Sequence, residues 1–249
     1  MIRNKYIVVI KYTESLPSEI DKKIDYLDYE VNRIVSYLKD KDDFTKELII
    51  NDYLSKNVNY DYTKNKKNTH NIYGALVEKE AVCDGFTNAC NVLLNKCNIE
   101  SILVLGNLKD ELHAWNLVKI GGNYYHLDVT SNISLKKDEG IYNHMFFNVT
   151  DEKITKTHKI KYPKIYPKCT ETKDNFYVKK GFILKNTDNP FTKINEIIDN
   201  SLNKQIIEFK NLDVPNLKTK MVDVLSKRKD KKSNSVTYYQ LEDIIIVKR

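Results

Sequence analysis

The adjacent glycines Gly121-Gly122 constrain this chain more than any other feature, because they predict a tight two-residue hairpin loop. An alternating segment, His113–Ile120, leads into the glycines, and a second segment, Asn123–Thr130, returns from them. A loop of this length fixes which residues face each other across the two predicted strands. The hairpin therefore sets the relative positions of the polar side chains that it carries.

In that register Trp115 faces Asp128, and His113 faces Thr130. His113 and Asp128 then share a face as diagonal neighbours, with backbones roughly 7–8 Å apart, a distance that their side chains can span. We expect Asp128 to fix the tautomer of the imidazole and to stabilise its charged form. A three-residue loop would move Asp128 to the other face unless a bulge restored it. The alternative interpretation is a surface His–Asp pair on a half-buried hairpin.

Cys83 lies just before a predicted buried helix, Gly85–Asn98, whose apolar residues recur at helical spacing. The free N–H groups and the positive dipole end of a helix N-terminus favour a thiolate and can hold an oxyanion. Alternatively, Cys83 is one more small buried apolar residue, as we expect for Cys90 and Cys97, which follow at steps of seven. Together with the hairpin, Cys83 suggests a catalytic set in the chain order Cys, His, Asp.

Three segments resemble the core of the transglutaminase-like superfamily, which has a papain-like fold: ELIINDYLSKNVNYD, YGALVEKEAVCDGFTNA and HAWNLVKIGGNYYHLDVT. By this resemblance Cys83 is the nucleophile, His113 the general base and acid, and Asp128 the orienting carboxylate. The resemblance extends over approximately residues 40–160. The chain departs from the family pattern at Ser131, where the family often has tryptophan, and this departure concerns the wall of the substrate cleft.

The resemblance implies a cysteine-dependent acyl-transfer enzyme that acts on a peptide or carboxamide bond through a thioester, with a protein or peptide as substrate. A transglutaminase-like cysteine protease or hydrolase ranks first, because no separate amine site or calcium loop is recognisable. Cross-linking, as a protein-glutamine gamma-glutamyltransferase, is one alternative, and a catalytically silent binding or scaffold module on the same fold is another. The backbone N–H of Cys83 is expected to donate to the oxyanion, with Tyr73 as a candidate for the second donor.

The predicted fold class is α+β. Residues 1–165 are expected to form a papain-like transglutaminase core of helices packed on an antiparallel sheet, and residues 166–249 a small basic α/β module. In the core we predict strands Lys5–Tyr12 and Ile141–Val149 and helices Ser18–Lys39, capped by Ser18, and Phe44–Lys56. In the module we predict strands Phe176–Leu184, Gln205–Phe209, Val236–Tyr239 and Asp243–Lys248 and helices Pro190–Asn203 and Val214–Lys229.

The basic excess of the chain belongs to its C-terminal part. Residues 1–149 carry a net charge of −2, and residues 150–249 carry +9. The run Lys227–Lys232 could bind an anionic polymer such as a cell-wall polyanion or a nucleic acid. A solvated helix end is the alternative, and aromatic residues do not interleave with these lysines as in a single-strand binding surface.

No metal or cofactor is predicted. His126, His144 and His158 do not sit at ligand spacing, and scattered histidines are more often structural or exposed. No glycine-rich phosphate loop or calcium loop is present either.

The sequence contains no stretch that approaches a membrane span, and the apolar run Tyr6–Ile10 is shorter than the core of a signal peptide. The family resemblance nevertheless favours an extracytoplasmic or cell-surface location.

Overall fold

The computed structural model describes residues 16–201, 206–228 and 236–248. The predicted strand Lys5–Tyr12 lies outside the described residues. At the centre of the core is an antiparallel sheet with the strand order β5-β4-β3-β6. The bounds of its strands are Ser101–Leu108 for β3, Glu111–Ile120 for β4, Asn123–Leu127 for β5 and His158–Ile160 for β6.

The hairpin β4–β5 has the register that its two glycines predict. Ile120 pairs with Asn123 and Asn116 pairs with Leu127, so the loop is Gly121-Gly122. Both glycines have positive φ, which a two-residue hairpin of this type requires. The two-residue loop predicted from the sequence is thus confirmed.

The predicted second strand is wrong beyond Leu127, because the chain turns there into the short helix α4 (Val129–Asn132). Asp128 is the N-cap of α4, and its side chain accepts from the backbone N–H of Ser131 at 3.0 Å. An N-cap carboxylate favours this helical turn over a continuing strand. Thr130 therefore belongs to a helix and does not pair with His113.

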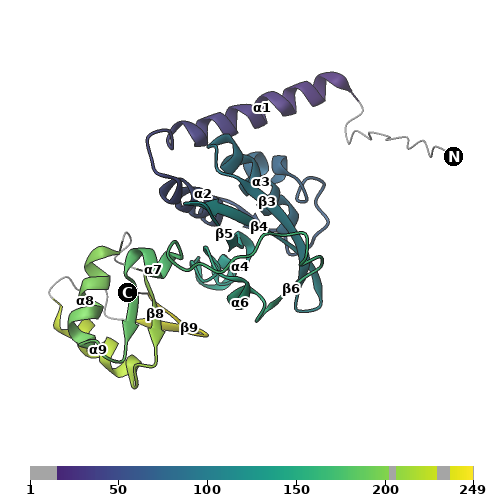
Figure 1. The fold of residues 1–249 in the computed structure, drawn as a ribbon. Helices are drawn as coiled ribbons and strands as arrows, with labels where there is room; N and C mark the ends of the chain where they lie inside the picture. The colour runs from purple at the N-terminus through teal and green to yellow at the C-terminus, as the bar shows by residue number, and fades with distance from the viewer. Residues whose placement is uncertain (1–15, 202–205, 229–235, 249) are drawn as a thin grey trace.

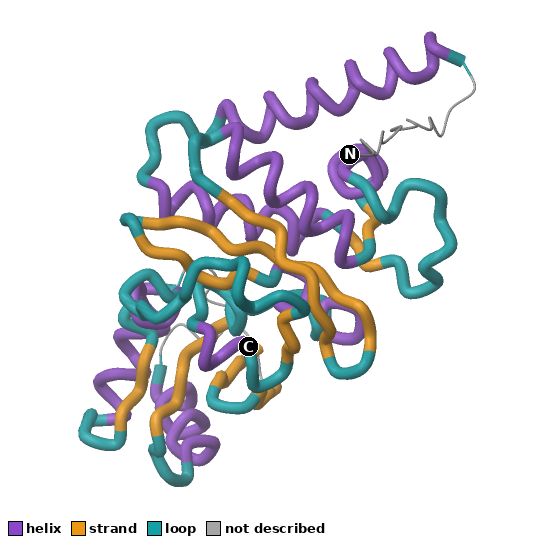
Figure 2. Tube along the Cα trace, turned by 45° about the vertical axis from the view of Figure 1, so that its right-hand side comes forward, coloured by secondary structure: helices purple, strands orange, loops and turns teal. Residues whose placement is uncertain are grey.

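Helices lie on one side of the core sheet, and irregular segments lie on the other (Figure 2). These helices are α1 (Pro17–Ser36), α2 (Asp43–Asn57) and α3 (Cys83–Lys96). α1 begins after Leu16 with proline in its first turn, so the predicted cap at Ser18 is wrong. Asp42 caps α2 by accepting from the N–H of Thr45 at 3.0 Å.

Between α2 and α3, a two-residue parallel ladder joins β1 (Asn59–Tyr60) to β2 (Glu80–Ala81). The π-helix η1 (Gly74–Glu78) lies between these strands. The ladder holds the intervening loop beside the start of α3, where the N–H of Val82 donates to the carbonyl of Thr69 at 2.9 Å.

The segment Ile141–Val149 is not a strand, contrary to the prediction, and only Val149 makes an isolated bridge, with His126. Side chains, and not a neighbouring strand, accept from several of the backbone N–H groups in this segment. The amide oxygen of Asn132 accepts from the N–H of Phe146 at 2.8 Å, and Glu208 accepts from that of His144 at 3.0 Å. The flanking helices are α5 (Lys136–Glu139) and α6 (Asp151–Ile154).

The C-terminal elements form a group of their own beside the core, with a mixed sheet in the order β7-β8-β10-β9 (Figure 1). β7 and β8 are parallel, and the other neighbours are antiparallel. The bounds are Phe176–Lys180 for α7, Ile183–Lys185 for β7, Pro190–Asn200 for α8, Ile206–Leu212 for β8, Leu217–Lys227 for α9, Thr237–Leu241 for β9 and Ile244–Lys248 for β10.

The predicted strand Phe176–Leu184 is wrong over most of its length, because α7 occupies its first half. Asn175 caps α7 by accepting from the N–H of Tyr177 at 3.2 Å, and Gly181 ends the helix with φ of +69°. Gln205 and most of the basic run up to Lys232 lie outside the described residues.

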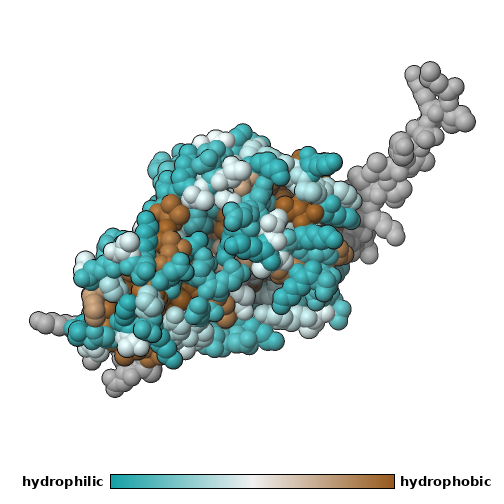
Figure 3. All heavy atoms as spheres, turned by 60° about the horizontal axis from the view of Figure 1, so that its bottom comes forward, coloured by the Kyte–Doolittle hydropathy of each residue, from teal (hydrophilic) through white to brown (hydrophobic). Residues whose placement is uncertain are grey.

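The fold is α+β, with helices packed on an antiparallel sheet, as predicted. Its buried apolar side chains form one cluster that extends from Val31 of α1 to Val247 of β10. On the face in Figure 3, hydrophobic residues appear as patches among hydrophilic ones.

None of the helices in the described ranges has the length and apolar character needed to cross a membrane. The domain boundary at residue 165 stays a prediction.

Candidate active site

Cys83 is the first residue of α3 and is half-buried. The first N–H groups of a helix have no acceptor within that helix, so the N–H of Cys83 is available to an oxygen outside it. The thiol lies 3.6 Å from a carboxylate oxygen of Asp84. The predicted helix thus begins two residues earlier than expected and includes the cysteine.

Gly85 explains why the loop can lie so close to this helix start. A Cβ at Gly85 would overlap the carbonyl oxygen of Thr69 and crowd the side chain of Ala81. Only glycine permits this backbone approach without displacement. The spacing Cys-x-Gly therefore has a steric reason that lies in the loop before α3.

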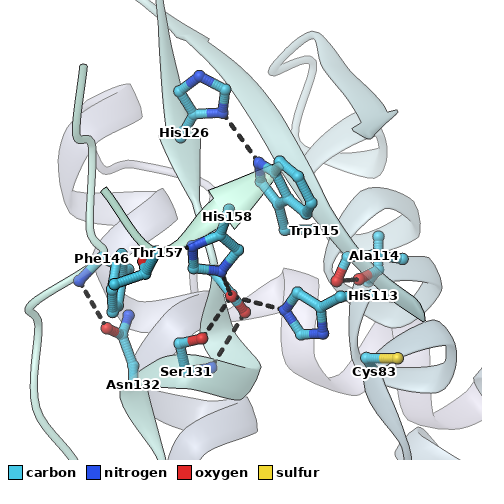
Figure 4. A network of polar contacts seen from close by, with 12 residues as sticks. Cys83, His113, Ala114, Trp115, His126, Ser131, Asn132, Phe146, Thr157 and His158 are labelled. Carbon is cyan, nitrogen blue, oxygen red and sulfur yellow. Dashed lines mark hydrogen bonds and ion pairs between the residues drawn. The ribbon is translucent and has the colours of Figure 1, made fainter. Parts of the chain in front are cut away.

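His113 and Asp128 meet on the face that the hairpin register predicts. His113 Nε2 lies 2.7 Å from Asp128 Oδ2, and both residues are buried. The second ring nitrogen of His113 faces Cys83 (Figure 4). Cys83 is also near enough to His113 to raise its pKa. The structure thus brings together the three residues predicted for the site.

In the His113–Asp128 pair, each residue stabilises the charged form of the other. Burial lowers the pKa of His113, but Asp128 and Cys83 together raise it more, to about 10. Burial raises the pKa of Asp128, but His113 and His158 outweigh that effect and hold it well below its usual range. His113 is therefore cationic and Asp128 anionic at neutral pH.

His158 is the site residue that the sequence interpretation missed. Its Nε2 lies 2.9 Å from Asp128 Oδ2, the same oxygen that accepts from His113 (Figure 4). β6 brings it there by pairing His158 with Leu108 of β3. No spacing pattern marks this residue, because the contact arises from strand pairing across the sheet.

Tyr60 and Lys64 lie near enough to Cys83 to interact with it electrostatically. Lys64 also pairs with Glu111 at 2.7 Å, which ties the loop after β1 to the start of β4. Tyr73, the candidate for the second oxyanion donor, has Lys23 of α1 over its ring at 4.9 Å.

The model of the transglutaminase-like superfamily matches residues 32–129, which include Cys83, His113 and Asp128. The chain contains a transglutaminase-like domain. Comparison with curated protein sequences gave no match.

Solved structures similar to this chain include a TGase, with a TM-score of 0.40 and 16% identity over 50% of this chain. Another is a putative cysteine protease from Cytophaga hutchinsonii, with a TM-score of 0.36 and 22% identity over 47% of this chain. The matched parts cover only 36% and 45% of those two proteins.

A second polar cluster of the transglutaminase-like fold lies next to the first. Trp115 Nε1 donates to His126 Nδ1 at 2.9 Å, and His126 Nε2 lies 3.0 Å from Asp151 Oδ1. Because an indole N–H can only donate, Nδ1 of His126 is unprotonated and Nε2 carries the proton. Burial also lowers the pKa of His126, in keeping with a neutral ring.

Cys169 is near enough to His126 and Asp151 to suggest a second catalytic or metal-binding set. However, both ring nitrogens of His126 are already engaged, so neither can take a proton from this thiol. Burial raises the pKa of Cys169 to about 12, which disfavours a thiolate nucleophile or ligand. To bind a metal through Nε2, the neutral His126 ring would have to carry its proton on Nδ1. The N–H of Trp115 points at Nδ1 and excludes a proton there.

Among the described residues, His113, Asp128 and His158 form a further group whose potential metal-ligand atoms lie near one another. Asp128 Oδ2 already accepts from both histidines and from the hydroxyl of Ser131 at 2.6 Å. Its other oxygen accepts from the N–H of Ser131. The donors around this carboxylate fit a buried anion held by hydrogen bonds better than a ligand for a cation.

Proposed function

We propose that this protein is a cysteine-dependent hydrolase that cleaves a peptide or carboxamide bond through a thioester. The contact of His113 with both Asp128 and Cys83 carries the proposal. Membership of the transglutaminase-like superfamily supports the same reaction type.

In the first step His113 already holds the proton of the Cys83–His113 pair, and the Cys83 thiolate attacks the carbonyl carbon. The developing oxyanion would accept from the backbone N–H of Cys83 at the start of α3. Tyr60 is our candidate for the second donor, because its side chain is near enough to Cys83 to interact with it. His113 then protonates the leaving amine as the C–N bond breaks.

In the second step water attacks the thioester and gives up a proton to His113. The C–S bond breaks, the acid is released, and the proton stays on His113 beside the regenerated thiolate. Asp128 stays ionised throughout and holds the imidazole by accepting from Nε2. An amine in place of water would give a cross-linked amide, so the acceptor decides between hydrolysis and transfer.

Alkylation by iodoacetamide as a function of pH tests the first step without a known substrate. Cys83 is expected to react faster than a small-molecule thiol near neutral pH, and His113→Ala is expected to remove the advantage. The buried cysteines Cys90, Cys97 and Cys169 are internal controls, because mass mapping should find them unmodified in the folded protein. A Cys83 that reacts no faster than an ordinary thiol would favour a silent scaffold.

Peptide and glutamine-plus-amine substrates then separate hydrolysis from cross-linking. Release of an acid from a peptide or carboxamide, lost in Cys83→Ala, is the result expected. A product that forms only with added amine would assign amine transfer instead. A Cys83→Ala protein as active as the wild type would exclude the mechanism.

A further inference from the structure

We propose that His158 is a positioning residue of this site, which holds the carboxylate of Asp128 in the orientation that accepts from His113. The inference rests on the proposed thiol chemistry of Cys83. It concerns a residue that contacts neither Cys83 nor a reacting atom and that acts through Asp128.

The geometry places two histidines on one oxygen. His113 Nε2 is 2.7 Å and His158 Nε2 is 2.9 Å from Asp128 Oδ2. The rings come from different strands, β4 and β6, and their centroids are 5.4 Å apart. Because the carboxylate is ionised, each of these nitrogens must donate. His158 therefore holds Oδ2 in a position where it can also accept from Nε2 of His113.

Burial makes each donor to Asp128 important. The side chain of Asp128 is 1% exposed and that of His158 is fully buried, so bulk water does not solvate the carboxylate. A carboxylate in such a place stays charged only if hydrogen bonds replace the lost hydration. Ser131 supplies its N–H to one oxygen and its hydroxyl to the other, and the two histidines complete the set.

His158 is itself held in one orientation. The hydroxyl of Thr157 lies 2.8 Å from its Nδ1, which leaves Nε2 for Asp128. Its ring packs against Trp115 and Phe146, with centroid distances of 5.1 Å and 5.2 Å. Because hydrogen bonding and ring packing both hold His158 in place, its side chain does not need to move when the charge on His113 changes.

A purely structural role would be satisfied by any side chain that fills the same space. His158→Leu keeps the volume but removes the donor, whereas His158→Gln can place an amide N–H near the position of Nε2. The comparison of these two variants therefore separates hydrogen bonding from packing. His126→Leu is the matched control, because His126 is equally buried and contacts Trp115 but does not hydrogen-bond to Asp128.

The experiment measures iodoacetamide alkylation of Cys83 as a function of pH in the full chain. Among the described residues, His113 interacts with Asp128 and His126 interacts with His158, while Cys83 interacts with His113. We expect His158→Leu to react about tenfold more slowly near neutral pH, the effect of losing one charge-assisted hydrogen bond. The acid limb of its plot of alkylation rate against pH should move to higher pH, because loss of the donor raises the pKa of Asp128.

The alkylation rate of Cys83 in His158→Gln should stay within about twofold of the wild-type rate. His126→Leu should keep the acid limb of the wild-type pH profile. Thr157→Val removes only the hydroxyl beside Nδ1 and should give a smaller shift in the same direction, even if His158→Leu does not fold. Equal effects of Leu and Gln, or a wild-type profile in His158→Leu and Thr157→Val, would overturn the role of His158. A wild-type Cys83 as slow as an ordinary thiol would instead overturn the proposed function.

Discussion

His113 Nε2 lies 2.7 Å from Asp128 Oδ2, although the residues are 15 positions apart in the chain. The short loop of the hairpin β4–β5 brings them to the same face. The turn into α4 then directs the carboxylate of Asp128 back toward the imidazole, because Asp128 is also the cap of that helix. One residue thus ends a strand, caps a helix and orients a histidine.

Asp128→Asn is expected to reduce turnover by at least about a hundredfold, because an amide can present its N–H to Nε2 and favour the wrong tautomer of His113. The melting temperature should fall as well, since His158 and Ser131 lose an anionic acceptor. Steady-state kinetics and thermal melting would check both effects. Asp110→Asn, the same substitution at an exposed position, is the control. Turnover in Asp128→Asn equal to that of Asp110→Asn would contradict the proposed role.

Tyr60→Phe tests the second oxyanion donor. Removal of one such donor costs about a hundredfold in kcat with little change in KM, because the interaction forms in the transition state. Tyr62→Phe is the matched control, since Tyr62 is exposed and its ring lies 5.0 Å from that of Tyr60. If kcat is the same in both variants, another group donates to the oxyanion.

The hairpin could be predicted from the sequence because its register depends on two adjacent glycines and the residues on either side of them. That local rule places His113 and Asp128 on the same face, and the turn into α4 completes their contact. The end of the strand at Leu127 could not be predicted in the same way. It depends on whether Asp128 continues a ladder or caps a helix, and both fit the sequence pattern.

The histidines outside the hairpin show where prediction from sequence stops. His144 and His158 are both buried, whereas a scattered histidine has no pattern that predicts its burial. His144 lies between Asp52 of α2 and Glu208 of β8, which are 92 and 64 positions away. His158 reaches Asp128 only because β6 pairs with β3. These contacts depend on the assembled fold and not on local spacing.

Gly85→Ala should destabilise the protein by about 1–3 kcal/mol, the usual cost of forcing an extra group into packed surroundings. The added methyl would push the start of α3 away from the carbonyl of Thr69, and Cys83 would move with it. We therefore expect slower alkylation of Cys83 in addition to a lower urea midpoint. Asn88→Ala, on the same helix but without an added atom, should leave both measurements close to those of the wild type. A normal urea midpoint in Gly85→Ala would show that the loop shifts without cost.

Glu47→Gln is expected to change how stability depends on pH. Glu47 is completely buried on α2, one of its oxygens accepts from Asn148 at 2.8 Å, and the other has no partner among the described residues. Burial raises the pKa of this carboxyl to about 8, from 4.5 in the unfolded chain. The folded state thus holds a proton that the unfolded state has released, so stability is full below about pH 4.5 and falls as the pH rises toward 8.

Glutamine keeps an acceptor for Asn148 and cannot ionise, so the variant should lose this part of the pH dependence. At pH 9 it should be more stable than the wild type by on the order of a few kcal/mol, and at pH 5 the difference should be much smaller. Urea unfolding at both pH values measures the change. Glu152→Gln, at an exposed position, should unfold like the wild type at each pH. His113 and His144 also lose stabilising charge as the pH approaches 10, but that loss is common to all three proteins and cancels in the comparison. A stability difference between Glu47→Gln and the wild type that is the same at pH 5 and pH 9 would mean that Glu47 does not hold its proton in the folded state.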